Sequence, residues 1–475
     1  VVQSWAVLQR HTPGALQRRF DTALLRANAR RFATAALRAR VQRAAGVAGA
    51  RASVSSAPPP PVGSFRSFHV IANLDTVNTR FQPVTARLEY VGTNILVYVD
   101  TAAPASFTAA DYANFAATFD QVLYPLDVNT FGPPSDIDQN GRLIMLLTPV
   151  VNGLTPSAEC DTQGYVAGFF SGGDLVSADS SSNQGEIFYA LAPDPTGKFS
   201  CAHPLNVLED ELGATFLHEL QHLINFSQHV LVRNSDEEEG WLDEGLSLIA
   251  EELGSLYYEN KFPPPSGRTN PIQIFPDSAE GYVAGLLGTS YDYLLGPDTT
   301  TLTLHSDADG GLNWRAGDWL LLRYLGDQKG GATFYKALVQ SPLIGIANIE
   351  AAAGEPFPGL FGSFSTAVFT DSLPGLARGQ VPARDRFTTR NLRRLYARVA
   401  TTDPTLPFSF PIQPKPLPAT GTLPGSLVPG TMSFYRATAS TSASTITITF
   451  ASPSGGRLPA ELHPQVSVFR LPPGI

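Results

Sequence analysis

The sequence lacks residues on which several classes of protein depend. Two cysteines among 475 residues are too few for a disulfide-rich scaffold. Charged residues make up only 16% of the chain and hydrophobic residues 43%, which excludes a chain kept disordered by its charge. No apolar run approaches the roughly 18 residues that a membrane-spanning helix needs, and we expect no membrane span.

A strong net positive charge marks the start of the chain. The net charge is −9, yet residues 1–51 contain ten arginines and a single acidic residue, Asp21. The rest of the chain therefore carries a net charge of −18. An enzyme that acts on nucleic acid needs a basic body that contacts phosphates, so we expect no nucleic-acid partner.

Residues 1–57 form an Arg-rich segment ahead of the main body. Apolar residues recur at helical spacing over residues 14–45, which predicts an amphipathic helix. We interpret it as a helix packed on the body, as a pro-segment, or as an anchor at a membrane surface. Four consecutive prolines favour a stiff linker over residues 58–63. Because the chain opens on Val1, we expect a secreted or cell-surface protein whose signal peptide has been removed.

The main body, residues 64–400, changes character at about residue 200. Its first part, 64–200, has short apolar runs between turns, which predicts a mixed α/β region. Its second part, 201–400, has helical periodicity and is predicted to be mainly helical. We expect strands at 95–99, 143–147, 165–170 and 187–191, and helices at 109–123, 241–253, 314–326 and 331–339.

The end of the chain is predicted to form a separate module. A second Pro-rich linker covers residues 401–420. Residues 421–475 contain short alternating runs, which predict a β-rich accessory module in the form of a small β-sandwich. Its expected strands are 433–437, 445–450 and 465–471. The fold class that follows is α+β.

The segment His218-Glu219-Leu220-Gln221-His222 carries the clearest chemical pattern. Residues i and i+4 share one face of a helix, so both imidazoles can reach one ion, with Glu219 beside that face. Zinc suits this arrangement, because a catalytic zinc site takes three protein ligands and leaves one position open. Apolar residues flank the segment, and buried polar groups without a partner are costly. The sequence therefore predicts a zinc site on this helix.

A third ligand is expected within the next 30 residues. The consecutive glutamates Glu237–Glu239 are predicted to lie in a solvated loop. Glu244 instead opens an apolar helical segment, where a buried carboxylate needs a cation. Glu244 is therefore the predicted third ligand, with Asp243 next in line, and the other candidates are His229 and Asp236.

Two segments of the chain resemble those of known zinc peptidases. Residues 218–226 followed by 241–245 resemble the gluzincin metallopeptidases, and within them the hyicolysin-type neutral metallopeptidases of bacteria. The resemblance extends over about residues 125–340 and includes the segments 131–142 and 316–325.

This resemblance implies a thermolysin-like catalytic domain with a mixed upper part and a mainly helical lower part. It implies one zinc ion as cofactor, bound by His218, His222 and Glu244. It also implies that Glu219 is the catalytic residue, acting as general base.

The chain departs from the family pattern at a position that orients a ligand. Relatives of thermolysin have an Asp four residues after the ligand Glu, where this chain has Leu248. Glu251, one turn further on, resembles the aminopeptidase branch of the clan and is placed to orient a histidine. The Gly-x-Met-Glu-Asn motif of aminopeptidases is absent, which argues against an aminopeptidase. The oxyanion-stabilising residue stays open among Tyr282, Tyr291, Tyr293 and His305.

Three oxygen-bearing residues alternate in the manner of a calcium loop. Asp136, Asp138 and Asn140 precede Gly141, but the twelfth position is Leu147 rather than Glu. The pattern indicates either a structural calcium site or a polar turn.

The two cysteines, Cys160 and Cys201, fit either one disulfide or two unrelated thiols.

The predicted function is that of a secreted zinc endopeptidase with protein or peptide substrates. The alternative is a surface or extracellular binding protein whose zinc site is structural or catalytically silent. An intact Glu219 favours the enzyme. The strand at 187–191 is predicted either to line the cleft as an edge strand that pairs with an extended substrate or to be a core strand.

Overall fold

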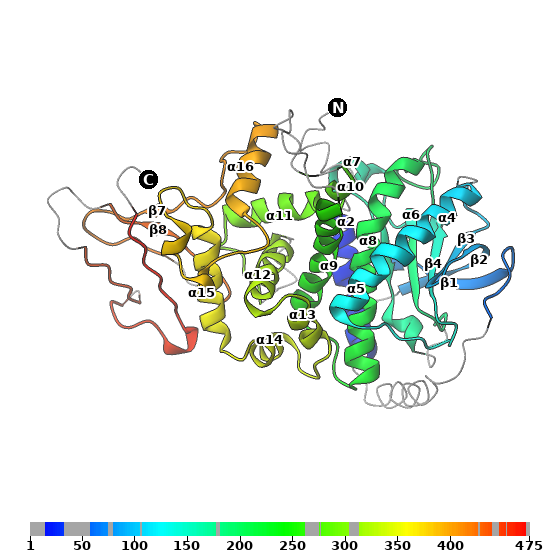
Figure 1. Cartoon of the computed structure of the whole chain (residues 1–475), viewed down its shortest axis with the longest axis horizontal. Helices are drawn as coiled ribbons and strands as arrows, with labels where there is room; N and C mark the ends of the chain where they lie inside the picture. The colour runs from blue at the N-terminus through cyan, green and yellow to red at the C-terminus, as the bar shows by residue number, and fades with distance from the viewer. Residues whose placement is uncertain are drawn as a thin grey trace. The chain divides into compact units, whose positions relative to one another are not determined.

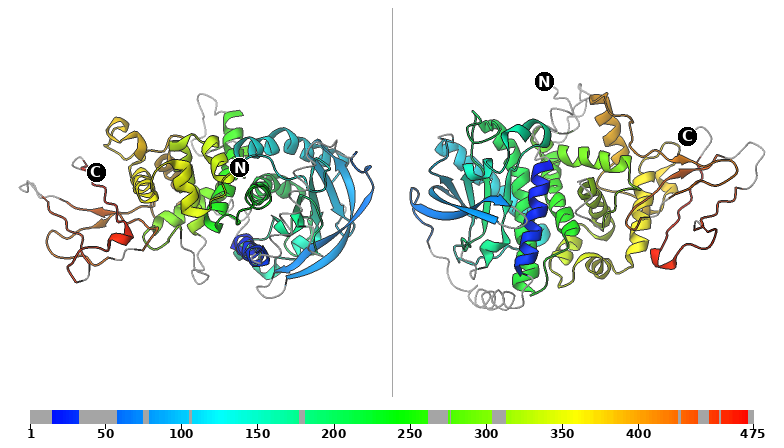
Figure 2. Two further views of the ribbon diagram at one scale, coloured as in Figure 1. Left: turned by 90° about the horizontal axis from the view of Figure 1, so that it is seen from below. Right: turned by 180° about the vertical axis from the view of Figure 1, so that it is seen from behind.

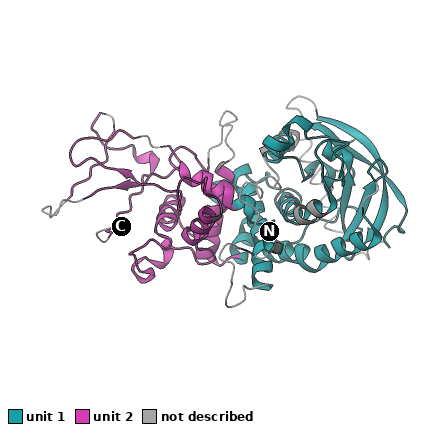
Figure 3. Cartoon of the chain, turned by 90° about the horizontal axis from the view of Figure 1, so that it is seen from above, with its two compact units in different colours: residues 1–286, 332–348 teal, residues 287–331, 349–475 magenta. Residues whose placement is uncertain are grey.

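The computed structural model describes residues 15–32, 58–74, 79–104, 107–176, 181–261, 275, 277–303, 313–425, 428–438, 446–452 and 454–471. The chain divides into two compact units (Figure 3). The first contains residues 1–286 and 332–348, and the second contains residues 287–331 and 349–475. The predicted division at residues 57, 63, 200, 400 and 420 stays a prediction. The fold is α+β.

The first unit is built on a curved six-stranded sheet with the order β1-β2-β3-β4-β6-β5 (Figures 1 and 2). Strands β1, β2 and β3 form an antiparallel meander, and β3, β4 and β6 are parallel to one another. Strand β4 is buried along its whole length, as its unbroken apolar sequence leads one to expect of a parallel strand. The bounds are β1 (Phe65–Leu74), β2 (Thr79–Val91), β3 (Ile95–Asp100), β4 (Leu143–Thr148), β5 (Gly168–Phe170) and β6 (Ile187–Leu191).

Of the two interpretations of residues 187–191, the core strand is confirmed and the edge strand is wrong. Strand β6 lies between β4 and β5, and the edge belongs to the three-residue β5, which runs antiparallel to β6. All five residues of β6 are buried, which suits an interior strand. At Gly168 the two strands come so close that a Cβ atom would lie 2.6 Å from the ring of Phe188.

Helix α8 (Leu205–Phe226) packs against β5 and β6 and against helix α9 (Gly240–Lys261). Aromatic rings fill the contact with the sheet, since Phe216 of α8 meets Phe188 with ring centroids 5.0 Å apart. The other helical segments of this unit are α2 (Ala15–Phe32), α4 (Ala109–Thr118), the π-helical turn 119–123, α5 (Tyr124–Phe131), α6 (Pro149–Asn152), α7 (Cys160–Gln163), the π-helical turn 227–232, α10 (Asp277–Glu280) and α13 (Ala332–Val339).

The second unit is mainly helical. Tyr324 packs against Phe364 and Phe387 in its core. Its helices are α12 (Asn313–Lys329), α15 (Phe357–Thr370) and α16 (Leu392–Thr402), while α11 (Ala284–Leu295) and α14 (Gly345–Ala353) each begin in the first unit.

The predicted C-terminal sandwich is not confirmed. The described residues after 402 contain one pair of two-residue strands, β7 (Lys415–Pro416) and β8 (Tyr435–Arg436). Neither 446–452 nor 454–471 contains a strand. The side chains that alternate in those segments are mostly exposed, so no second sheet buries them.

Cys160 and Cys201 form a disulfide, which joins α7 to the segment before α8. Among the described residues, no helix combines the length and the apolar character that crossing a membrane would require.

Candidate metal centre

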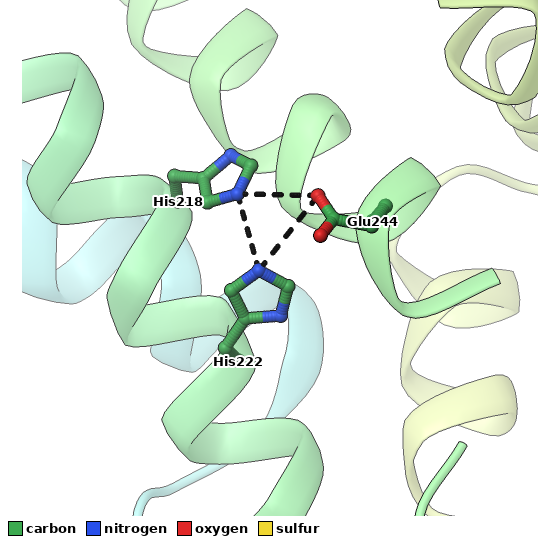
Figure 4. Close-up of side chains that lie close together, drawn as sticks. All are labelled: His218, His222 and Glu244. Carbon is green, nitrogen blue, oxygen red and sulfur yellow. Dashed lines mark hydrogen bonds and ion pairs between the residues drawn. The ribbon is translucent and has the colours of Figure 1, made fainter. Parts of the chain in front are cut away.

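Helices α8 and α9 bring His218, His222 and Glu244 together (Figure 4). The Nε2 atoms of the two histidines lie 3.1 Å apart. Oε2 of Glu244 lies 3.5 Å from Nε2 of His218 and 4.0 Å from Nε2 of His222. All three residues are buried, and Glu244 is fully so. The group that the sequence predicted is therefore a real cluster in space.

Each imidazole is oriented by a carboxylate on its other nitrogen. Nδ1 of His218 lies 2.7 Å from Oε1 of Glu251, and Nδ1 of His222 lies 2.8 Å from Oδ2 of Asp243. Carboxylates accept hydrogen bonds, so each Nδ1 donates, and an imidazole held in this way would offer the Nε2 lone pair to a metal ion once its second proton is displaced. The predicted orienting role of Glu251 matches this geometry, whereas Asp243 faces the far side of His222 rather than the cluster.

The cluster fits a zinc ion. Two atoms bound to one zinc at about 2.0–2.1 Å in tetrahedral geometry lie about 3.3 Å apart. The separations within the cluster, from 3.1 to 4.0 Å, bracket that value. Two neutral imidazoles and one buried carboxylate also form a donor set that zinc prefers.

The charges around the cluster favour a cation. Burial lowers the pKa of His218, but Glu244 and Glu251 outweigh it and hold that pKa well above its usual value. Burial likewise lowers the pKa of His222, and Asp243 raises it to about 9. The imidazoles therefore sit in a field of carboxylates that a bound cation would neutralise.

Glu219 lies next to the cluster and is tied to the edge strand. Its Oε2 accepts a hydrogen bond of 2.8 Å from the backbone N–H of Phe170 in β5. Burial raises the pKa of this carboxyl to about 8, against the two nearby imidazoles, which lower it. A carboxyl with a raised pKa can take up and release a proton near neutral pH.

A small pocket opens beside the cluster. Glu219 and His222 of α8 line it together with Phe170 of the edge strand. The rest of its wall comes from α2 (Asp21, Leu24, Leu25 and Asn28), from the end of α8 (Asn225 and Phe226), from α9 (Asp243) and from the segment that leads into α9 (Glu237 and Glu238).

The prediction that Glu237–Glu239 form a solvated loop is wrong for Glu238. This side chain is buried and accepts hydrogen bonds from the backbone N–H of Gly345 and from Nδ2 of Asn348. These partners hold the segment before α9 against α14, and burial raises the pKa of Glu238 to about 7.

The three described candidates for the oxyanion-stabilising residue have different surroundings. Tyr282 packs its hydroxyl against Gly213, five residues before His218. Tyr291 donates its hydroxyl hydrogen to the carbonyl of Phe408 in the second unit. Tyr293 is fully buried in that unit, and His305 lies outside the described residues.

A second group of carboxylates lies on the loop between α5 and β4. Oxygen atoms of Asp136, Asp138 and Glu186 lie within 4.8 Å of one another. Asn140 is not part of this group, because its Nδ2 donates to Asp138 and its Oδ1 accepts from the N–H of Arg142. Glu186 was missed by sequence reasoning, because only the pairing of β6 with β4 brings it to this loop.

Other polar residues around the cluster carried no recognisable signal in the sequence. Asn225 donates from Nδ2 to Asp243. Ser247 donates from its hydroxyl to Oε1 of Gln221. Both stand one helical turn from a member of the cluster, a spacing that many unrelated helices share.

No profile of a known protein family matches the chain. Over 187 residues it is 29% identical to the neutral metalloprotease ShpI of Staphylococcus hyicus. The matched part makes up 38% of this chain, and the chain spans about 40% of the relative's length. This likeness and the His218–His222–Glu244 cluster together support a metal-dependent hydrolase of the protease class.

Proposed function

We propose that the protein is a secreted zinc-dependent endopeptidase, with His218, His222 and Glu244 as zinc ligands and Glu219 as general base. The observation that carries the proposal is the arrangement on α8 and α9: two Nε2 atoms and Glu244 face one point, and Glu219 stands beside them in the wall of a pocket. The relative that the chain matches over part of its length is itself a neutral metalloprotease, which supports the proposal.

The chain's own residues supply the remaining chemistry. When bound, zinc would polarise the scissile carbonyl and make water more acidic. Glu219 accepts the proton of the attacking water on a carboxylate oxygen and then delivers it to the leaving amine. Glu251 and Asp243 hold the two imidazoles in the tautomer that leaves Nε2 free. A dicationic neighbour lowers the pKa of a carboxyl, which prepares Glu219 to act as a base.

Strand β5 is suited to hold an extended substrate. The N–H and C=O groups of Gly168 bond to Gln17, and the N–H of Phe170 bonds to Glu219. These backbone groups therefore face away from β6. Adding a peptide strand to such an edge supplies main-chain hydrogen bonds without selecting its sequence. Binding along the middle of a chain in this way favours cleavage of internal bonds.

Hydrolysis of casein by the zinc-loaded full-length chain tests this function. We expect cleavage at internal bonds, mapped by mass spectrometry, that phenanthroline blocks and added zinc restores. A binding protein with a structural zinc site, the alternative, would retain zinc and release no fragments.

The disulfide supports the secreted location. Disulfides persist in oxidising compartments and are rare where thiols are kept reduced. Cys160 and Cys201 are the chain's two cysteines, and they are paired. We include a bacterial, exported setting in the proposal on this ground and on the organism of the partial relative.

We also propose a structural calcium site at Asp136, Asp138 and Glu186. Glu186 is buried, and its Oε1 accepts from the hydroxyl of Ser135 and the N–H of Ile137. Its Oε2 is a buried oxygen without a hydrogen-bond partner among the described residues. An unpaired buried carboxylate oxygen beside two aspartates is a set of oxygen ligands that calcium prefers.

Calcium should therefore raise the melting temperature of the protein. At a concentration 100 times the Kd, a site of this kind adds about 2.7 kcal/mol, or about 5 °C in Tm. Glu186→Gln should remove this calcium-dependent shift, measured by calorimetry, while Asp161→Asn, at an exposed aspartate, should keep it. Equal shifts in the two variants would exclude Glu186 as a ligand.

A further inference from the structure

Helix α2 lies in the first unit with one face turned inward (Figure 2). The buried residues follow the helical repeat and share one face of the helix: Gln17, Phe20, Asp21, Leu24 and Asn28. Phe20 packs on Phe169 of the edge strand, with ring centroids 5.0 Å apart. Three of the five, Asp21, Leu24 and Asn28, line the pocket that contains Glu219 and His222. The helix thus covers both the edge strand and the pocket.

Gln17 pairs with the edge strand in the way that a substrate strand would. Its Nε2 donates to the carbonyl of Gly168 at 2.8 Å. Its Oε1 accepts from the N–H of Ala167 at 2.6 Å and lies 3.4 Å from the N–H of Gly168. A primary amide offers one acceptor and donors in one plane, as a peptide group does. The outward groups of Gly168 are therefore already occupied.

Asp21 brings a negative charge into the same pocket. Its Oδ1 accepts from Nε2 of Gln17 at 2.6 Å, so the two side chains are held as a pair. Asp21 and Glu219 line the same pocket, so the Asp21 carboxylate stands in the wall that also holds the proposed base.

We propose that α2 occupies the substrate cleft and that it must leave β5 before an extended peptide can bind. This inference rests on the proposed function, since it assigns the cleft to a peptide substrate. The segment that carries α2 then acts as a built-in competitor, in line with the pro-segment interpretation of residues 1–57. Its Arg-rich remainder contrasts with the acidic body, with charges of opposite sign that favour docking.

The test replaces Gln17 by Ala in the full-length chain, with Arg19→Ala as the matched control because Arg19 is exposed on the same helix. In metal-free protein, we expect amide hydrogen exchange of Ala167 and Gly168 to become about tenfold faster in Gln17→Ala alone, since about two hydrogen bonds are lost. The N–H of Phe170, which bonds to Glu219, is the internal reference.

Peptide binding supplies the second readout. A fluorescein-labelled casein peptide of about ten residues should bind about tenfold more tightly to Gln17→Ala than to Arg19→Ala, because less of the protein is blocked. The measurement uses fluorescence anisotropy in a Glu219→Gln background, which prevents cleavage. The double variant Phe20→Asp/Leu24→Asp, which places charges on the buried face of α2, should strengthen binding further.

The outcomes separate this inference from the proposed function. Unchanged exchange and unchanged peptide affinity in both the Gln17 variant and the double variant would overturn the inference. Another outcome is tighter peptide binding in those variants while the zinc-loaded double variant with intact Glu219 cleaves no casein. That result would support the covered cleft and contradict the peptidase function. Tighter binding with faster cleavage supports both.

Discussion

Glu219→Gln should lower kcat for peptide hydrolysis by about 10²–10⁴-fold at full zinc occupancy. The glutamine keeps the length of the side chain and an oxygen that can accept from the N–H of Phe170, so β5 stays in place. It cannot take up the proton of water. The expected signature is a fall in kcat and in kcat/KM of similar size, as for a group that acts in the transition state.

Matched zinc content makes this comparison meaningful. Both proteins should contain one zinc per chain by metal analysis after dialysis, and both should carry the same α2 sequence, so that access to the pocket is equal. Gln221→Glu is not a suitable control. Gln221 accepts a hydrogen bond from the Ser247 hydroxyl inside the buried α8–α9 contact, and the variant would place a charge there. Turnover like that of the parent protein in zinc-loaded Glu219→Gln would rule out the proposed base.

Glu244→Ala should remove most of the zinc. Loss of an orienting carboxylate typically costs about 10–100-fold in metal affinity, and loss of a direct ligand should cost more. Glu251→Gln, which changes the partner of His218, is therefore the graded comparison. We expect zinc affinity to decrease in the order parent, Glu251→Gln, Glu244→Ala, measured by competition with a chromogenic chelator.

The reverse order of zinc affinities would contradict the assignment of Glu244 as the third ligand. Full zinc retention in Glu244→Ala would mean that another carboxylate completes the site. Asp243 is the first alternative by sequence, although its oxygens bond to His222 Nδ1 and to Asn225. Circular dichroism would show whether each variant keeps its helices, because Glu244 is fully buried.

The cluster could be predicted because its determinants are local. His218 and His222 are one helical turn apart, and any helix over those residues places them on the same face. Glu244 was identified from the apolar helix around it, which also predicts burial. Such inferences need only the period of one helix.

The errors all concern residues that meet through distant parts of the chain. The order of strands is set by which strands pair; the unbroken apolar run Ile187–Leu191 indicates burial on both faces, but it does not say which strands lie beside it. The edge strand itself has three residues, too few to show a periodic pattern. Glu238 is buried only because Gly345 and Asn348, more than 100 residues away, fold over it.

The same reason explains what sequence reasoning missed in the second carboxylate group. Asp136 and Asp138 show a spacing that can be read directly. Glu186 joins them because β4 and β6 pair in parallel, with Ile144 opposite Ile187. A register of this kind is a long-range property, and one residue of slip would turn its side chains to the other face.

The three residues of the zinc cluster lie on two consecutive helices, α8 and α9, which has a consequence for the lifetime of the protein. A cation held between the helices is bound by the native state and released on unfolding, so zinc would add about 4 kcal/mol at 1,000 times the Kd. Resistance to heat and to digestion by other proteases would then vary with the free zinc in the surroundings. Metal-poor surroundings would limit not only how fast the protein works but how long it survives.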